Sequence, residues 1–363
     1  MTELASSTQG FSQAELALAT RNRGMPLEAL RHDRTPTGLH YLLVHFDIPD
    51  LDEATWRLEI GGRVGRPRAW SLDELRARPA RTMPVTMECA GNGRALLEPR
   101  ALSQPWLVEA IGTAEWTGTP LVGLLEEAGV EPDAVEIVFT GADRGIQGDV
   151  EHQYQRSLPV DEAMRDEVLL AYEMNGQALE PQHGYPLRLL VPGWYGMTSV
   201  KWLRSIEAVA DPFAGYQQAT AYRLQRDEAD AGEPVTRIRV RALMSPPGIP
   251  DFFTRHRVVD AGPVTLRGRA WSGSALVTRV EVGVDGVWSE AGLGEPVGEH
   301  AWRAWHHTWM ATPGEHTLTC RATDANGDMQ PTEPPWNLQG MANNAVQHVP
   351  VTVRQGNSVT TSV

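Results

Sequence analysis

The sequence has few cysteines, an excess of negative charge and no long apolar run. Its two cysteines, Cys89 and Cys320, are too few for a disulfide framework, or for a zinc or iron–sulfur site built from several cysteines. The formal net charge of −14 argues against a nucleic-acid-binding protein, which would carry a basic stripe. No apolar run has the length of a membrane-spanning helix. We therefore expect neither a nucleic acid nor a membrane among its partners.

The first residues also lack the pattern of an export signal. They contain no basic stretch followed by an apolar stretch, and no twin-arginine pair. We therefore expect a cytoplasmic protein, and a periplasmic location is less favoured.

The chain of 363 residues is long enough for two domains. Residues 226–234 are polar and resemble a linker, and the residue pattern changes there. We predict a mixed α+β domain over residues 1–230 and an all-β domain over residues 231–363.

Helix starts and strands can be predicted in the first domain. Ser12 and Ser71 are each followed three residues later by glutamate, which is the pattern of a helix capping box. The dipeptide Asn175-Gly176 predicts a tight hairpin turn. No GxGxxG motif is present, which argues against a dinucleotide-binding fold. Apolar, β-prone residues predict strands at 39–48, 83–89, 135–140, 167–173 and 178–191.

The second domain has the pattern of short strands joined by tight turns. Apolar residues alternate with polar ones over 264–270, 280–284 and 318–322. Asp285-Gly286 and Asn326-Gly327 follow as hairpin turns. This pattern predicts a small sandwich of the immunoglobulin type.

Cys89 is the first candidate for chemistry. A free cysteine is most often a small buried apolar residue, and we keep that interpretation for Cys320, which lies on the inward phase of a strand. Cys89 instead ends an apolar strand and enters Ala-Gly-Asn-Gly-Arg, where small residues leave room and Arg94 adds positive charge. Such surroundings favour a thiolate, either as a nucleophile or as a soft metal ligand. A nucleophile would need a base, for which His183 or His45 is available.

A second candidate lies in the segment from His183 to Lys201. His183, Arg188 and Lys201 are donor or cationic groups separated by apolar runs. Their convergence would suit a phosphate or another anion. The alternative is a solvated surface, which the flanking apolar runs make less favourable.

Several motifs, in order, resemble the sulfite oxidase family of molybdopterin-dependent enzymes. The segment Thr86–Arg94 (TMECAGNGR) resembles the part of that family that supplies the molybdenum-binding cysteine. His183–Arg188, and the residues from Pro192 to Leu203, resemble its pterin-binding stretch, and Leu169–Gly176 belongs to the same pattern. The resemblance continues through residues 236–354 as the family's immunoglobulin-like dimerisation domain, whose ending contains Trp336-Asn337-Leu338 and Gly340.

The resemblance implies a role for each matching residue. Cys89 would bind the metal. Tyr154, Arg94 and Trp106 would form the substrate pocket, with Arg94 binding an anion. The residues implied in cofactor binding are Tyr41, Leu42, Leu43, Val44, His45, Cys89, Asp143, His183, Arg188, Ser199, Val200 and Lys201.

The same resemblance implies the fold, the cofactor and the partners. The fold would be an α+β sulfite-oxidase-type molybdopterin-binding domain followed by an all-β immunoglobulin-like sandwich. The cofactor would be molybdenum–molybdopterin without a nucleotide, and neither haem nor flavin is expected. The chain would form a homodimer, oxidise a small anionic substrate such as sulfite, and pass electrons to an external acceptor such as a cytochrome c.

Three positions depart from the family pattern of charged pocket residues. Leu43 and Gly93 stand where arginines are common, and His348 stands near another such position. Fewer fixed charges would then surround the substrate. Reaction of the same cofactor with a sulfoxide or nitrate therefore stays open, as do a non-catalytic assembly protein and a thiol hydrolase that uses Cys89 and His183.

Overall fold

The computed structural model describes residues 3–6 and 8–355, and its contacts divide the chain into two units. The first unit contains residues up to Met25, Pro36–Ile238 and Trp336–Asn343. The second contains Pro26–Thr35, Arg239–Pro335 and the residues from Asn344 onward. No helix in the described ranges is long and apolar enough to cross a membrane.

Two short segments belong to a unit whose other residues are far from them in sequence. In each case a buried arginine of that unit binds a main-chain carbonyl group of the segment. In the first unit, Arg94 Nε donates to the Gln339 carbonyl at 2.9 Å. In the second, Arg269 Nε donates to the Leu30 carbonyl at 2.7 Å, and its Nη1 pairs with Asp33 at 2.7 Å. Each bond satisfies a carbonyl or carboxylate group that would otherwise lack a partner inside the protein.

The main segment of the first unit, Pro36–Ile238, ends beyond the boundary that the polar stretch at 226–234 suggests. That stretch is the connection of a small hairpin, in which β13 (Arg223–Leu224) pairs with β14 (Glu233–Pro234). The chain then stays with the first unit, because Val235 N donates to the Tyr222 carbonyl and Ile238 N to the Gly193 carbonyl.

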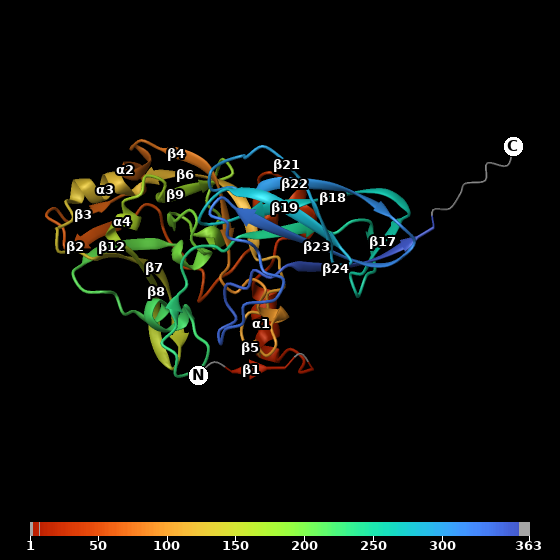
Figure 1. Cartoon of the computed structure of the whole chain (residues 1–363). Coiled ribbons are helices and arrows are strands. Elements are labelled where there is room, and N and C mark those ends of the chain that lie inside the picture. Colours follow the sequence, from red (N-terminus) through yellow and green to blue (C-terminus); the bar gives the residue numbers. More distant parts are fainter. Residues whose placement is uncertain (1–2, 7, 356–363) are drawn as a thin grey trace. The chain divides into compact units, whose positions relative to one another are not determined.

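Two five-stranded sheets form the frame of the first unit (Figure 1). One sheet has the order β10-β9-β6-β4, with β11 also paired to β9, and the other has the order β3-β2-β12-β7-β8. Their strands are β4 (Arg81–Glu88), β6 (Ile111–Pro120), β9 (Leu169–Met174), β10 (Gln177–Ala178), β11 (Arg188–Leu190), β2 (Leu58–Gly62), β3 (Arg68–Trp70), β7 (Glu136–Gln147), β8 (Val150–Pro159) and β12 (Leu203–Val209). A further short pair joins β1 (Leu4–Ala5) to β5 (Arg100–Ala101).

Both faces of the β4-β6-β9 sheet are buried. One face packs with the second sheet and with α2 (Leu72–Arg76) and α3 (Leu121–Ala128) in a core that includes Leu125, Phe139 and Leu170. The other face forms a separate core that includes Trp116, Cys89 and Trp106. Cys89, which directly follows β4, therefore lies in apolar surroundings.

Both predicted helix starts are confirmed. In α1 (Gln13–Arg21), the Ser12 side chain accepts from Glu15 N while Glu15 accepts from Ser12 N. Ser71 and Glu74 make the same reciprocal bonds at the start of α2. These bonds satisfy backbone donors that a helix start leaves free.

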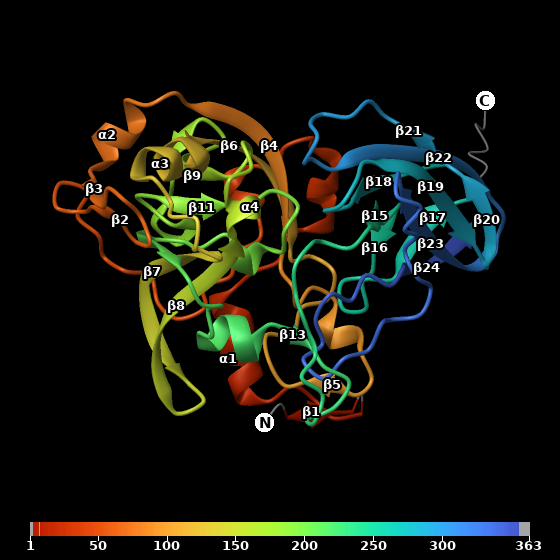
Figure 2. The same ribbon diagram turned by 60° about the vertical axis from the view of Figure 1, so that its left-hand side comes forward.

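The strand predictions are confirmed in part. The strands expected at 83–89, 135–140 and 167–173 correspond to β4, β7 and β9, and Asn175-Gly176 forms the turn between β9 and β10. The β7–β8 hairpin runs on to Gln147 and extends beyond the neighbouring strands (Figure 2). The remaining short elements are α4 (Val160–Ala163), the 3-10 helices η1 (Leu27–Arg31), η2 (Thr37–Leu39), η3 (Arg94–Leu96), η4 (Pro181–His183) and η5 (Gly196–Thr198), and the π-helix η6 (Gln217–Ala221).

Two strand predictions are wrong. Residues 178–191 do not form one strand, because η4 and Gly184, which has φ +108°, separate β10 from β11, and Pro181 and Pro186 have no N–H to donate to a sheet. Residues 39–48 are irregular apart from one bridge between Leu42 and Arg23. Side chains from elsewhere in the unit bind the backbone there, as where Val44 N donates to Asn22 Oδ1 at 2.8 Å.

The second unit is the predicted all-β sandwich. A four-stranded sheet has the order β15-β18-β22-β21, and a six-stranded sheet has the order β16-β17-β24-β23-β19-β20. Leu266, Trp305, Val280 and Cys320, which come from both sheets, share its core. The strands are β15 (Arg241–Ser245), β16 (Ile249–Pro250), β17 (Arg257–Asp260), β18 (Gly262–Trp271), β19 (Val277–Val284), β20 (Val287–Glu290), β21 (Gly292–Leu293), β22 (Arg303–Ala311), β23 (Gly314–Asp324) and β24 (Gln347–Arg354).

A buried ion pair ties α1 to the rest of the first unit and gives a stability prediction. The Arg100 and Glu15 side chains are only 4% and 3% exposed. Replacing arginine in Arg100→Met would leave the Glu15 carboxylate buried without its cation. We expect this change to lower the free energy of unfolding by about 3–5 kcal/mol, measured by urea denaturation.

An exposed ion pair on the β7–β8 hairpin provides the control. The side chains of Arg144 and Glu151 are 72% and 65% exposed. Arg144→Met should change the same free energy by less than about 1 kcal/mol, because water screens the pair. Equal effects of the two substitutions would contradict the role of burial.

Candidate active site

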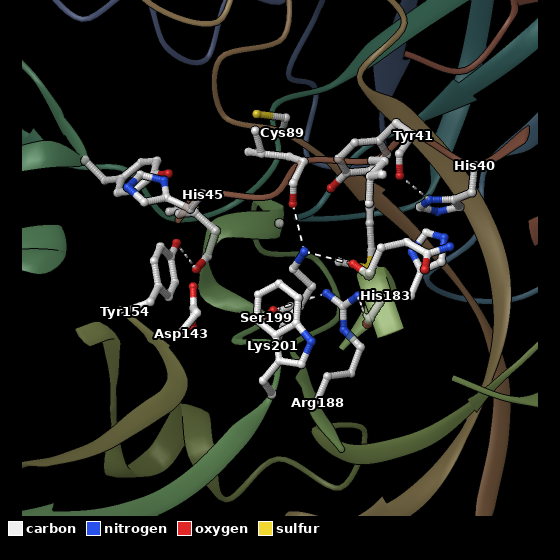
Figure 3. Close-up of a pocket in the computed structure, with 18 residues that line it drawn as sticks. His40, Tyr41, His45, Cys89, Asp143, Tyr154, His183, Arg188, Ser199 and Lys201 are labelled. Carbon is white, nitrogen blue, oxygen red and sulfur yellow. Dashed lines mark hydrogen bonds between the residues drawn. The ribbon is translucent and has the colours of Figure 1, made fainter. Parts of the chain in front are cut away.

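The described residues of the first unit enclose a cavity of about 690 Å³, including its opening to solvent. The cavity is formed where strands end and loops begin, and Figure 3 shows its lining. The lining residues are His40, Tyr41, Leu42, Leu43, His45, Met87, Cys89, Asp143, Tyr154, Gln182, His183, Arg188, Gly196, Met197, Ser199, Lys201, Trp202 and Tyr222.

Cys89 directly follows β4, and its loop is held by a buried asparagine. Asn92 Nδ2 donates to Glu88 Oε1 at 2.8 Å, and Asn92 Oδ1 accepts from Ala110 N at 3.1 Å. Burial raises the pKa of the Cys89 thiol, whereas the Arg94 guanidinium and the Gly91 N–H act to lower it. A bound cation would favour the thiolate further, as expected for a metal ligand.

Arg94 and Trp106 lie beside Cys89 but do not line the cavity. The Arg94 guanidinium is buried, its Nε donates to the Gln339 carbonyl at 2.9 Å, and its Nη1 donates to the Gln104 carbonyl at 3.3 Å. Trp106 shares the apolar core of Cys89, and its indole acts to lower the pKa of that thiol. Both predicted pocket residues therefore support the cysteine loop in this structure.

The side of the cavity away from Cys89 is cationic. In the view of Figure 3, Arg188 and Lys201 lie opposite the Cys89 thiol. Arg188 donates to the carbonyls of His183 and Ser199 at 3.0 and 3.1 Å. Lys201 Nζ donates to the carbonyls of Leu43 and Gln182 at 2.8 and 3.0 Å.

These cations rest on aromatic faces rather than on carboxylates. Arg188 Cζ lies 4.9 Å from the Trp116 ring centroid, and Lys201 Nζ lies 4.2 Å from that of Trp202. Neither cation makes an ion pair with a carboxylate within residues 3–6 and 8–355. The close approach of the two side chains depends on Gly184, where a Cβ atom would lie 3.1 Å from Lys201 Cβ and 3.2 Å from Arg188 Cβ.

Burial lowers the pKa of each basic group here. Desolvation lowers the pKa of Arg188 to about 10. Desolvation and the charge of Arg188 lower that of Lys201 to about 7. Desolvation, with His40 and Arg188 nearby, lowers the pKa of His183 to about 2. An anion bound among these groups would raise all three values and would be held by them in return.

His45 and Asp143 line the cavity as expected. His45 Nε2 lies 3.0 Å from Gln147 Oε1, and burial lowers the pKa of this histidine. Asp143 lies where the β7–β8 register shifts, between Thr140 and Arg144. Desolvation raises its pKa to about 7, although Lys201 acts to lower it.

The other predicted residues divide into lining and supporting positions. Tyr41, Leu42, Leu43 and Ser199 line the cavity. Val44 and Val200 are buried and lie outside the lining. Val200 belongs to the main core of the first unit.

Tyr154 lines the cavity with its hydroxyl already engaged. Its Oη donates to the Met197 carbonyl at 2.8 Å, as Figure 3 shows. Its ring lies 5.3 Å from that of His45, measured between centroids. Tyr154 therefore presents an acceptor oxygen, rather than a free proton, to the cavity.

The structure adds lining residues that sequence reasoning missed. His40 lies beside His183, with ring centroids 5.9 Å apart, and burial lowers its pKa to about 4. Tyr222 is the other titratable addition. His40 adjoins the predicted Tyr41–His45 segment and could have been included by position, whereas Tyr222 follows a π-helix that no residue pattern indicated.

The departures from the expected charge pattern have structural explanations. Gly93 has φ +90°, and a Cβ atom there would lie 2.9 Å from Asn343 Nδ2, so a side chain at this position would be strained and would displace the Asn343 amide. Leu43 lines the cavity and uses its carbonyl to bind Lys201. His348 is exposed on β24 of the second unit and is not a lining residue.

Comparison with known proteins defines the class of this site. Residues 45–217 match the oxidoreductase molybdopterin binding domain, and residues 250–354 match the Mo-co oxidoreductase dimerisation domain. The sulfite oxidase of Gallus gallus is 32% identical over 337 residues, which cover 86% of this chain and 71% of that protein. The chain belongs to the sulfite oxidase family of molybdopterin-dependent oxidoreductases.

Other relatives differ in activity and length. Mitochondrial sulfite oxidase of Mus musculus is 34% identical over 88% of this chain, and NADH nitrate reductase of Solanum lycopersicum is 31% identical over 89%. The chain spans only 61% and 39% of those two proteins. The sulfane dehydrogenase SoxCD of Paracoccus pantotrophus has the same fold, with a TM-score of 0.79, 27% identity, and coverage of 97% of this chain and 90% of that chain. The predicted fold class is confirmed.

The cavity fits the cofactor of this family. Arg188 Nε and His183 Nε2 are buried and have no hydrogen-bond partner within the described ranges. A phosphate group would satisfy such donors, and Lys201 would add a second cation. The Cys89 thiol at the other side is a suitable soft ligand for molybdenum.

Loss of one cation should therefore weaken cofactor retention. We expect Arg188→Met to lower affinity for the pterin about tenfold or more, because it removes charge-assisted hydrogen bonds. The measurement is molybdenum and released pterin per chain after purification and dialysis. Arg204→Met is the control, since Arg204 is exposed on β12. Full retention in Arg188→Met would contradict the assignment.

Proposed function

We propose that this chain is a molybdenum-cofactor oxidoreductase that oxidises sulfite to sulfate and passes electrons to an external acceptor such as a cytochrome c. The observation that carries this proposal is the single cavity that joins a buried cysteine thiol to an unneutralised cation cluster, in a member of the sulfite oxidase family. The bound cofactor supplies oxygen-atom transfer and accepts two electrons from the substrate.

The protein's own residues position the cofactor and the substrate. Cys89 would bind the metal, and Arg188, Lys201 and His183 would bind the phosphate and pterin. Because the cavity is largely enclosed by buried side chains, these interactions are stronger than they would be in water. Asp143 and His45 would contact the pterin at the wall nearest Tyr154.

Further parts of the proposal concern assembly and partners. The match of residues 250–354 to a dimerisation domain supports a homodimer formed through the second unit. Sulfite is the proposed small anionic substrate. The nucleotide-free form of the pterin, the absence of haem and flavin, and the cytoplasmic location stay predictions.

Cys89→Ser tests the proposed role of the thiol. We expect sulfite-dependent reduction of ferricyanide or cytochrome c to fall at least about a thousandfold, because the metal loses its protein ligand. Pterin fluorescence should persist, since Arg188, Lys201 and His183 are unchanged. Cys320→Ala is the matched control, because that cysteine lies in the core of the second unit, and it should keep sulfite oxidation. Full activity of Cys89→Ser would disprove the mechanism.

A substrate that contains sulfane sulfur is the second candidate. Arg94 is held by main-chain carbonyls, and Leu43 stands where an arginine was expected, so the cations that line the cavity are those assigned to the cofactor. The structural relative acts on sulfane sulfur, according to its name. Reduction of the bound molybdenum by thiosulfate, which contains a sulfane sulfur, but not by sulfite would favour this candidate. Reoxidation by nitrate would favour nitrate reduction.

A further inference from the structure

His45 lines the cavity with only one of its two ring nitrogens engaged by the protein. Its Nε2 lies 3.0 Å from Gln147 Oε1 and 3.4 Å from Gln217 Nε2, and neither glutamine lines the cavity. Residues 3–6 and 8–355 make no hydrogen bond to the other nitrogen, Nδ1. Nδ1 is therefore the polar atom of this ring that is available to a ligand in the cavity.

The contacts of the two glutamines determine which nitrogen of His45 carries the proton. Gln217 Nε2 donates to Gln147 Oε1 at 2.8 Å, which directs this acceptor oxygen at His45 Nε2. A lone pair on Nε2 would face the lone pairs of that oxygen at 3.0 Å, whereas a proton there completes a hydrogen bond. Burial lowers the pKa of His45, so the ring is neutral and carries one proton. Since that proton lies on Nε2, Nδ1 is an acceptor.

The Gln147 side chain reaches His45 because the β7–β8 hairpin packs on the segment that contains the histidine. Gln147 is the last residue of β7. Two residues earlier, a Cβ atom at Gly145 would lie 2.4 Å from Phe46 Cδ1, so the missing side chain makes room for the Phe46 ring. That ring meets the His45 ring edge-on, with centroids 4.6 Å apart. The hairpin and the two aromatic residues are thus held in close contact.

The Gln217 side chain is held by the π-helix η6. π-helical turns are rare and occur often at functional sites. Gln217 is buried, and its carbonyl accepts from Arg156 Nη1. The preceding residue, Tyr216, stacks on His152 with ring centroids 4.6 Å apart, and His152 Nε2 lies 3.0 Å from the Gln147 carbonyl. Main-chain and side-chain contacts therefore both fix Gln147 against the π-helix.

An acceptor at His45 complements the cations of the same cavity. Arg188 and Lys201 offer only donors, which suit a phosphate group. A pterin ring has N–H groups of its own, and these need acceptors when the ring is buried. His45 lies on the same side of the cavity as Tyr154 (Figure 3), with ring centroids 5.3 Å apart. Its Nδ1 supplies a neutral acceptor there.

We propose that Gln147 and Gln217 are positioning residues that keep the proton of His45 on Nε2, so that Nδ1 accepts from an N–H group of the bound pterin. This inference rests on the proposed function, since it takes the molybdenum–pterin cofactor as the ligand. The glutamines would act through His45 without touching the cofactor. A fixed acceptor would then recognise the pterin ring, whereas the cations would recognise its phosphate.

Gln147→Met removes the amide oxygen and keeps the length of the side chain. His45 then loses the partner that holds its proton on Nε2. We expect the purified holoprotein to release its pterin about tenfold faster, followed by the fluorescence of the released pterin. Gln155→Met is the matched control, because Gln155 lies on the same hairpin outside the cavity lining and donates to Thr140 Oγ1. It should release pterin at the original rate. An unchanged rate in Gln147→Met would overturn the proposal.

Gln147→Glu separates positioning from packing. A carboxylate oxygen also accepts from His45 Nε2 and from the Gln217 amide. At about pH 8.5, where the imidazole stays neutral, the rate of pterin release should therefore stay within about threefold of the original. Equal acceleration of release by the Met and Glu substitutions would show a packing role and would contradict positioning.

The position of the proton can also be measured directly. In holoprotein labelled with 15N-histidine, the protonated and unprotonated ring nitrogens have different NMR shifts, and a His45→Gln sample identifies the signals of His45. We expect a protonated Nε2 and an unprotonated Nδ1 in the unmodified protein. This preference should be lost in Gln147→Met at an equal thermal unfolding temperature. A proton on Nδ1 in the unmodified holoprotein would refute the inference.

Failure of the proposed function would look different. An unmodified holoprotein that contains molybdenum and pterin but does not turn over sulfite would contradict the proposed reaction, and the release rates and His45 signals would still decide on the glutamines. Normal sulfite oxidation by the unmodified enzyme, together with an unchanged rate of pterin release in Gln147→Met, would contradict this inference alone.

Discussion

The site depends on two cationic side chains, the buried Arg188 and the partly buried Lys201, that form no ion pair with a carboxylate in the described part of the chain. Arg188 and Lys201 are satisfied by main-chain carbonyls and lie over Trp116 and Trp202. Carbonyl dipoles and aromatic faces offset only part of the cost of burying charge. The rest of the cost of burying these charges is offset by the stability of the surrounding fold, and a bound anion would reduce it. The backbone at Gly184 leaves room for the close approach of these two side chains.

The same constraint explains where sequence reasoning worked and where it failed. Local patterns predicted the capping boxes at Ser12 and Ser71, the strand that ends at Cys89, and the alternating strands of the second unit. They failed at 39–48 and 178–191, the two segments whose carbonyl groups bind Arg188 and Lys201. Their apolar residues face the cavity and core, but several of their backbone groups, such as the carbonyls of Leu43 and Gln182, bind side chains instead of a neighbouring strand. The spacing of apolar residues cannot show whether a backbone group binds a side chain or a neighbouring strand, because the bond depends on partners that are distant in the chain.

The site could be predicted to the extent that its residues lie in compact motifs. Cys89, His183, Arg188 and Lys201 stand in segments whose order resembles a family, and the structure brings them to one cavity. Tyr222 lies in no such motif and reaches the cavity only because η6 and the β13–β14 hairpin fix its main chain. Gln147 and Gln217 are ordinary polar residues in sequence, and their contact with His45 joins positions that are far apart in the chain.

The three buried arginines around the cavity have different electrostatic effects. Arg188 faces the cavity and suits the cofactor anion. Arg94 packs on Gly91, where a Cβ atom would lie 2.8 Å from its Cζ, and its charge favours the thiolate of Cys89. Arg156 stands behind the tyrosines and acts to lower the pKa of both Tyr154 and Tyr222. Of these three arginines, only Arg188 lines the cavity, together with hydroxyl and apolar groups such as those of Tyr222 and Met87. If the substrate binds beside Cys89, its selection would then depend on shape and on neutral polar contacts more than on a lining arginine.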